Sequence, residues 1–300
     1  MTATLIDGKE IAAQVRTEVA EDVAKLKQQH NVTPGLAVVL VGDDSASALY
    51  VASKQKAARE AGMHAEDHIM PASTTMVELK AVITKLNDDV NIHGILVQLP
   101  LPDHLDEHEV MEFLNPMKDV DGLHPVSMGL LLAGRPRFVP ATPAGIQQML
   151  LRTGHSPEGR HVVVCGRSDI VGKPVAALLV QRNSDANATV TVCHTRTKNL
   201  ADITRQADIL IAAIGKANAI TADMVKDGAV VIDVGTNHIP DASKKSGRRL
   251  VGDVDFDTVS QKAAAITPVP GGVGPMTIAM LLANTLKAAQ LAASGQFGSS

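Results

Sequence analysis

The chain has 300 residues, of which 45% are hydrophobic and only 2% are aromatic, with no Trp. This length is enough for two compact domains or one large one, and a core with so few aromatic residues has to be built from aliphatic side chains, as in the doubly covered strands of a parallel sheet. The formal net charge is −4 and the Lys and Arg residues are scattered, which argues against nucleic acid as a partner.

The first third of the chain alternates apolar runs with helical patterns. The run GLAVVLVG (35–42) is short and β-branched, which predicts a buried strand. Residues 45–61 predict a helix that ends at Gly62, and residues 76–89 have the apolar spacing of a second helix. HGILVQLPLP (93–102) predicts another strand, interrupted by prolines that cannot continue a central ladder. The segment is therefore a βαβ-type unit.

A passage rich in Pro and Gly, residues 115–143, is the expected domain boundary. Beyond it, residues 160–181 predict a strand, a glycine loop and a helix, and a last helix is expected over 276–293. Three more strands are predicted at α/β spacing, over 188–195, 207–215 and 228–235. We therefore expect an α/β protein with a Rossmann-type parallel sheet, divided into residues 1–140 plus 276–300 and residues 141–275.

The glycine loop at 166–174 reads GRSDIVGKP and follows the apolar strand VVVC. Tight glycine turns let backbone N–H groups and a helix N-terminus approach a phosphate. The glycines are Gly166 and Gly172 and do not form the usual G-x-G-x-x-G, so a plain strand-to-helix turn remains an alternative. Arg167 and Ser168 lie inside the loop and offer a guanidinium and a hydroxyl to an anion.

The end of the next predicted strand indicates which dinucleotide is used. An NAD site often has an acidic residue there for the ribose, whereas this chain has Cys193, His194, Thr195 and Arg196. An acidic group would repel a ribose phosphate, while basic and hydroxyl groups bind one. The pattern favours NADP.

Tyr50, the only tyrosine, precedes Lys54 by four residues on a predicted helix, so the two side chains share one face. A lysine is useful as a base only if its surroundings lower its pKa. Spacing alone favours a surface lysine on a helix that also has Lys56 and Arg59. Tyr-x-x-x-Lys is also typical of short-chain dehydrogenases, but there the nucleotide glycines come first, whereas here Tyr50 precedes Gly166.

Five motifs occur in order along the chain, namely YVASK (50–54), VQLPLP (97–102), KDVDGLHP (118–125), GRSDIVGKP (166–174) and TPVPGGVGPMT (267–277). Together they resemble the bifunctional methylene-tetrahydrofolate dehydrogenase/cyclohydrolase (FolD) family, from about Ile6 to Ala289. The resemblance implies a folate-binding domain facing a Rossmann domain across a cleft, in a homodimer. It also implies NADP-dependent oxidation of the methylene bridge of the folate, followed by hydrolysis of the methenyl product to formyl-tetrahydrofolate.

The resemblance also implies roles for particular residues. Lys54 matches the catalytic lysine, which moves protons during hydrolysis, and Gln98 matches the glutamine that hydrogen-bonds it. Tyr50 would stack on or orient the folate ring, and Asp121 matches the aspartate that holds the pterin through its N–H groups. Further substrate contacts are expected from Ser47, Gly272 and Val273. The expected cofactor contacts are Gly166, Arg167, Ser168, Gly172, Thr195, Gly215 and Thr236, the last replacing a common isoleucine.

Several other patterns are expected to have no chemical role. His104 and His108 match an inverted zinc-protease motif without a third ligand, and His64 and His68 lie in a polar, loop-like stretch. We expect no metal, turn roles for Asp119 and Asp253, and a packed thiol at Cys165. The charged run SKKSGRR (243–249) predicts an exposed hairpin.

Two other functions remain open from the residues alone. One is a Rossmann dehydrogenase of another small substrate, which would not need Gln98 or Asp121, and the other is a nucleotide-binding module without catalysis. The two cysteines are too few for a disulfide framework, and no apolar signal core or run of about 18 apolar residues is present. A cytoplasmic protein without a membrane partner is expected.

Overall fold

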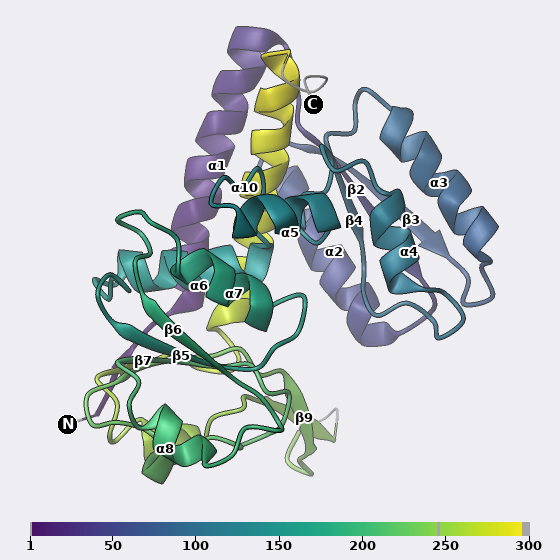
Figure 1. Cartoon of the computed structure of the whole chain (residues 1–300). Coiled ribbons are helices and arrows are strands. Elements are labelled where there is room, and N and C mark those ends of the chain that lie inside the picture. The colour runs from purple at the N-terminus through teal and green to yellow at the C-terminus, as the bar shows by residue number, and fades with distance from the viewer. Residues whose placement is uncertain (1, 245–246, 296–300) are drawn as a thin grey trace. The chain divides into compact units, whose positions relative to one another are not determined.

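The computed structural model describes residues 2–244 and 247–295 (Figure 1). Backbone contacts divide the chain into two compact units. Unit 1 contains Met1–Ala12 and Thr142–Thr277, and unit 2 contains Ala13–Ala141 and Ile278–Ser300.

Unit 2 contains a three-stranded parallel sheet in the order β3-β2-β4. The central strand β2 (Gly35–Val41) is buried along its whole length, as its β-branched sequence predicts. The two edges are β3 (His64–Met70) and β4 (Gly94–Val97). The carboxyl ends of these strands lie at one edge of the sheet, which is where parallel sheets place their functional residues.

Helices cover both faces of this sheet (Figure 1). On one face, α3 (Met76–Asp88) and α4 (Glu107–Phe113) pack on β2 and β4 in a core that includes Val39, Ile83 and Val110. A capping box formed by Thr75 and Glu78 begins α3. On the other face, α2 (Ser45–Glu60) contacts β2 and β3.

Two elements of unit 2 differ from expectation. The stretch expected to be loop-like around His64 and His68 is the strand β3, because it pairs with β2 in full register and needs only one buried face as an edge strand. The strand predicted over 93–102 ends at Val97. The N–H of Gln98 still donates to Val39 O at 2.8 Å, but the prolines that follow have no N–H with which to continue the pairing.

Unit 2 also contains most of α1 (Gly8–His30) and α10 (Val273–Ala293), and the short helix α5 (Pro125–Leu132), which lies inside the passage expected to be a boundary. By length and composition alone, α10 is the one helix in the described part of the chain that is apolar enough to cross a membrane. Half of its apolar 18-residue stretch is buried, and Leu281 and Leu282 lie in the interior, as in a core helix.

Unit 1 is built on a six-stranded sheet in the order β1-β11-β8-β7-β5-β6, in which all neighbouring pairs are parallel. The strands are β1 (Thr4–Leu5), β5 (His161–Cys165), β6 (Thr189–Cys193), β7 (Ile209–Ala212), β8 (Val230–Asp233) and β11 (Ala265–Ile266). Helix α7 (Gly172–Leu179) contacts β5 and β6, and α6 (Ala141–Arg152), α8 (Leu200–Thr204) and α9 (Phe256–Val259) complete the unit. The predicted α/β class and Rossmann-type sheet are confirmed.

The bounds of unit 1 differ from the expected domain bounds at the N-terminus. Residues 1–140 were all expected in one domain, but Thr4 pairs with Ala265, and Ile6 N donates to Ile266 O at 2.9 Å. This pairing adds the first twelve residues to unit 1. β1 has only two residues, too few to show the apolar alternation by which a strand is predicted from sequence.

The charged run 243–249 extends from the connection after β9 (Asn237–Pro240) into the first two residues of β10 (Arg248–Val251), and these two strands form an antiparallel pair. The predicted hairpin is therefore present, although residues 245 and 246 lie outside the described part of the chain.

Candidate active site

Helix α2 places Ser47, Tyr50 and Lys54 on one face, because these residues are three and four positions apart. The helix begins at a cap in which the Asp44 carboxylate accepts the N–H of Ser47 at 2.7 Å. The Lys54 side chain is buried, with a relative exposure of 5%. Its Nζ lies 5.0 Å from the centroid of the Tyr50 ring, within the range of a cation–π contact.

Lys54 Nζ donates a hydrogen bond to Gln98 Oε1 at 2.9 Å. Gln98 directly follows β4, and its Nε2 donates to the carbonyl of Leu99 at 2.6 Å. This second bond fixes the amide so that its oxygen is the atom turned toward Lys54. The amine is therefore held by a neutral acceptor.

The surroundings of Lys54 make its proton easier to remove. Burial lowers the pKa of Lys54, and the negative charge of Asp121 opposes part of that change. Burial likewise raises the pKa of Asp121, with Lys54 opposing the rise and Asp119 adding to it. The lysine and the aspartate thus lie close enough to influence each other's charge, as expected for residues of one site.

Asp121 is held in a tight loop between Asp119 and His124. The Asp119 carboxylate accepts N–H groups from Leu123 at 3.2 Å and from His124 at 2.9 Å, so its predicted turn role is confirmed. On the other side of Asp121, Asn284 Nδ2 of α10 donates to Val120 O at 2.8 Å and also bonds a second carbonyl, that of Val139, at 2.9 Å.

Asn284 was missed by the sequence reasoning. It lies 164 residues beyond Val120 in a largely apolar helix, so its only sequence signal is a polar residue within the apolar face.

The remaining predicted substrate residues lie in different units. Ser47 is on α2 in unit 2, whereas Gly272 and Val273 lie in unit 1, where α10 begins. Their contact with a shared substrate stays a prediction.

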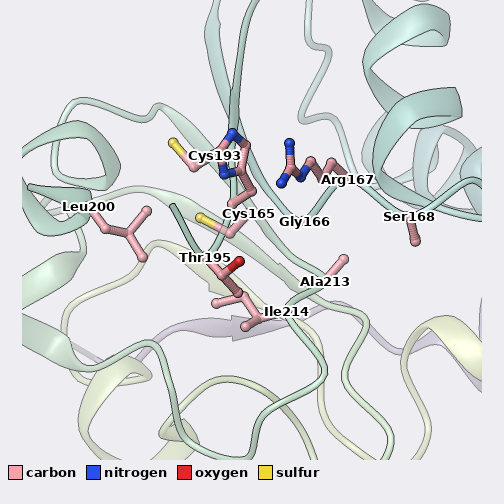
Figure 2. Close-up of a pocket in the computed structure, with 10 residues that line it drawn as sticks. Cys165, Gly166, Arg167, Ser168, Cys193, Thr195, Leu200, Ala213 and Ile214 are labelled. Carbon is pink, nitrogen blue, oxygen red and sulfur yellow. The ribbon is translucent and has the colours of Figure 1, made fainter. Parts of the chain in front are cut away.

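Unit 1 has a pocket of about 210 Å³ at the carboxyl ends of β5, β6 and β7 (Figure 2). Its lining residues are Cys165, Gly166, Arg167, Ser168, Cys193, His194, Thr195, Leu200, Ala213 and Ile214. Across the view in Figure 2, Leu200 marks one end, Arg167 and Ser168 the other, and Thr195 lies between them. Four of the predicted cofactor residues therefore line one pocket.

The two glycines of the loop are required by close packing. Gly166 has φ of 143°, and a Cβ there would lie 2.1 Å from the carbonyl oxygen of Ala213. A Cβ on Gly172 would lie 2.3 Å from the oxygen of Gly166. The turn can therefore pass directly from β5 into α7, which leaves the helix N-terminus close to the pocket.

The pocket has the chemistry of an anion site. Its lining includes the guanidinium of Arg167 and the hydroxyl groups of Ser168 and Thr195, and it includes no carboxylate. Ser168 Oγ accepts the N–H of Val171 at 3.2 Å, which leaves its O–H available to donate. These groups fit a phosphorylated ribose better than a ribose with free hydroxyls, which would call for an acidic partner.

Gly215 and Thr236 lie just beyond the carboxyl ends of β7 and β8, at the same edge of the sheet. They are not among the residues that line the pocket, although the neighbouring Ile214 is. Their contact with the cofactor stays a prediction.

Cys165 and Cys193 are register partners on β5 and β6, and both are free and buried. Burial raises the pKa of the Cys165 thiol to about 12, and the pKa of Cys193 is also raised, mainly by burial. Neither forms a thiolate at neutral pH, so the predicted packed thiol at Cys165 is confirmed.

The histidine motif at 104–108 serves local structure. His104 Nε2 bonds to Thr74 O at 2.8 Å, and Glu107 accepts the N–H of Leu101 at 3.1 Å. In the part of the chain that the structure describes, no group of three or more His, Cys, Asp or Glu side chains is arranged to hold a metal ion.

A Rossmann-type sheet with an anion pocket, joined to a unit with a buried lysine, defines a nicotinamide-nucleotide enzyme with a separate substrate unit. Two family models match the chain. Residues 6–121 match the catalytic domain of tetrahydrofolate dehydrogenase/cyclohydrolase, and residues 140–293 match its NAD(P)-binding domain. The chain belongs to the tetrahydrofolate dehydrogenase/cyclohydrolase family.

Individual relatives agree over almost the full length. The bifunctional protein FolD of Dehalococcoides mccartyi is 55% identical over 98% of this chain and 99% of its own length. The crystal structure of FolD from Campylobacter jejuni is 47% identical, with a TM-score of 0.90 over 96% of this chain and 99% of that one. The FolD of Trypanosoma brucei, complexed with NADP cofactor and inhibitor, is 41% identical, with a TM-score of 0.92 over 97% and 99%.

Proposed function

We propose that this protein oxidises 5,10-methylenetetrahydrofolate to 5,10-methenyltetrahydrofolate with NADP⁺ and hydrolyses the product to 10-formyltetrahydrofolate. Membership of the family supports both activities. The single structural observation that supports the hydrolysis is the buried Lys54 amine, held by the neutral Gln98. A carboxylate in place of Gln98 would keep the lysine cationic and unable to accept a proton.

In the oxidation, bound NADP⁺ would supply the acceptor for a hydride from the methylene bridge, which would leave the folate as a methenyl cation. The protein's contribution is to orient the folate. Asp121 would accept N–H groups of the pterin, and Tyr50 would support the ring beside Lys54. Two charge-assisted hydrogen bonds to one carboxylate fix an orientation as well as a position.

In the hydrolysis, the oxygen of a water molecule adds to the bridge carbon, and neutral Lys54 accepts one of its protons. The C–N5 bond then breaks as the Lys54 ammonium returns that proton to N5. The hydroxyl proton leaves to solvent as the formyl C=O forms. Lys54 ends neutral, and the net release is one proton. A positioned general base or acid of this kind accelerates such a step by roughly 10²–10⁴-fold.

NADP is proposed over NAD because Arg167 and Thr195 line the pocket and no carboxylate does. The NADP-bound relative from Trypanosoma brucei supports this choice. The cleft between the folate and nucleotide domains and the homodimer belong to the same proposal and rest on the family resemblance. A cytoplasmic location is also proposed, and two adjacent thiols that remain free suit a reducing compartment.

One assay tests this function. Purified protein is given methylenetetrahydrofolate and NADP⁺, and NADPH and methenyltetrahydrofolate are followed by absorbance. Growth of the NADPH signal with later decay of the methenyl signal is expected. Nucleotide binding without NADPH formation would instead support a non-catalytic module, and light scattering of the same sample tests the dimer.

A further inference from the structure

The loop after β10 contains a wholly buried carboxylate, that of Asp253, with a relative exposure of 0%. It accepts the N–H groups of three successive residues. Its Oδ2 accepts from Ile214 at 2.5 Å and from Gly215 at 2.9 Å, and its Oδ1 accepts from Lys216 at 3.0 Å. The entire turn that follows β7 is therefore attached to one side chain.

The same carboxylate also holds the segment that follows β8. Asn237 Nδ2 donates to Asp253 Oδ1 at 2.8 Å, and Asn237 directly follows the predicted cofactor residue Thr236. Gly235 packs so closely on this group that a Cβ there would lie 2.4 Å from Asp253 Oδ1. One side chain thus connects the two segments in which Gly215 and Thr236 lie.

The backbone around Asp253 is itself hydrogen-bonded to the side chain of Asp233, the last residue of β8. The N–H of Asp253 donates to Asp233 Oδ1 at 2.9 Å, and the N–H of Val254 donates to Asp233 Oδ2 at 3.0 Å. The loop that bears Asp253 is therefore fixed to the sheet, and the position of its carboxylate is set by the strand and not by the loop.

A buried carboxylate is a poor source of stability, because removing it from water costs as much as its hydrogen bonds return. It does impose a geometry, since bonds from N–H groups to a charged acceptor are short and directional. The geometry is imposed where open parallel sheets bind nucleotides, outside the carboxyl ends of the strands. Ile214 connects Asp253 with the nucleotide pocket, since its N–H bonds to the Asp253 carboxylate and its side chain lines that pocket.

We propose that Asp253 is a positioning residue for NADP: it holds the segments after β7 and β8 in the conformation that receives the nucleotide. This inference rests on the proposed function. Asp253 does not line the pocket and acts through Ile214, Gly215, Lys216 and Asn237.

The test compares nucleotide binding with methenyl hydrolysis in the same preparation. Asp253→Asn keeps the shape of the side chain but replaces one acceptor oxygen by an amide that repels N–H donors. We expect the Kd for NADP⁺, measured by calorimetry, and the KM for NADP⁺ to rise about tenfold or more. Methenyl hydrolysis, assayed without nucleotide, should stay within about twofold because Lys54 lies in unit 2.

A milder variant and a matched control accompany this change. Asn237→Ala removes one of the four donors to Asp253 and should raise the Kd for NADP⁺ by about two- to fivefold. Asp255→Asn changes a carboxylate two residues away that accepts from Thr258 Oγ1 and should leave the Kd unchanged.

Two results would overturn the proposal. The first is an unchanged Kd for NADP⁺ in Asp253→Asn, and the second is an equal loss of both activities, which would make the role one of general folding. If Asp253→Asn does not fold, an unchanged Kd in Asn237→Ala rejects the proposal. Failure of the proposed function itself would be visible separately, as a wild-type protein that binds NADP⁺ without forming NADPH.

Discussion

At the scale of single residues, burial separates Lys54 from the other cations of α2. Lys56 lies two positions further along the helix, and its side chain is exposed and 3.8 Å from Glu60. Lys54 instead lies against the sheet, where loss of hydration lowers its pKa, and Gln98 offers it no charge. The spacing from Tyr50 puts Lys54 on the same helix face whether Lys54 is a catalytic base or a surface lysine. The sequence alone could therefore not decide between these two roles.

The first prediction concerns this amine. Lys54→Met keeps the length of the side chain and removes the base, so methenyl hydrolysis should fall by about 100-fold or more. The Kd for NADP⁺ should not change, because the nucleotide pocket lies in unit 1. Stopped-flow absorbance of the methenyl compound measures the rate, and Lys56→Met is the matched control. Full hydrolysis in Lys54→Met would remove this residue from the mechanism.

A second prediction concerns the phosphate preference. Arg167 presents a guanidinium to the pocket, and loss of a charge-assisted hydrogen bond should weaken NADP⁺ binding by about tenfold in Arg167→Ala. NAD⁺ lacks the ribose phosphate, so its binding should change much less. Calorimetric titration with each nucleotide measures both constants. Equal losses for the two nucleotides would contradict the phosphate assignment.

At the scale of elements, the pattern of apolar residues predicted the buried strands better than the edges. β2 and β8 consist mainly of aliphatic residues and were located closely. β3 was missed because its sequence, HAEDHIM, has three consecutive polar residues, no aliphatic run and no strict apolar alternation. β1 and β11 have two residues each, too few for any periodic signal, and only their pairing reveals them.

Long-range contacts explain why the site was only partly predictable. The resemblance supplied Lys54 and Gln98, which are 44 residues apart in the sequence, but no local pattern connects them. Asp119 was predicted to form a turn because Asp commonly bonds nearby backbone N–H groups. Asp253 was given the same local role, whereas its main partners lie 37 to 39 residues away. A sequence pattern predicts hydrogen bonds between residues that are close in the chain, such as those of Asp119, and not distant ones such as those of Asp253.

Helix α10 supplies a third prediction, through the buried Asn284 that bonds the carbonyls of Val120 and Val139. Asn284→Ala leaves both carbonyls unsatisfied next to Asp121, at a cost of about 1–3 kcal/mol each. We expect the KM for the folate substrate to rise about tenfold, with the Kd for NADP⁺ unchanged. Gln290→Ala, on the exposed face of α10, is the control. An unchanged folate KM would show that Asp121 keeps its position without this contact.

At the scale of the whole molecule, stability should depend on pH through Asp233. Burial raises the pKa of this carboxyl to about 6, although three backbone N–H groups oppose the rise. Between pH 3.8 and 6 the folded state therefore binds more protons than the unfolded state, and the free energy of unfolding falls as pH rises through this window. The loss is about 3 kcal/mol at most.

Asp233→Asn removes this titration. Urea unfolding of both proteins at pH 4, 5 and 6 should show a wild-type free energy that decreases with pH relative to the variant. Other carboxylates affect both proteins alike, so the difference between the two isolates Asp233. A difference that is constant across the three pH values would contradict the raised pKa.

The pairing of β1 with β11 has a consequence for how the chain folds as it leaves the ribosome. β1 has its partner β11 about 260 residues later, so the six-stranded sheet closes only after the chain has been synthesised as far as Ile266. Contacts of such large sequence separation slow folding, because a long loop must close before they form. A fragment that starts at residue 142 would lack this outer strand and expose the backbone edge of β11, which invites aggregation.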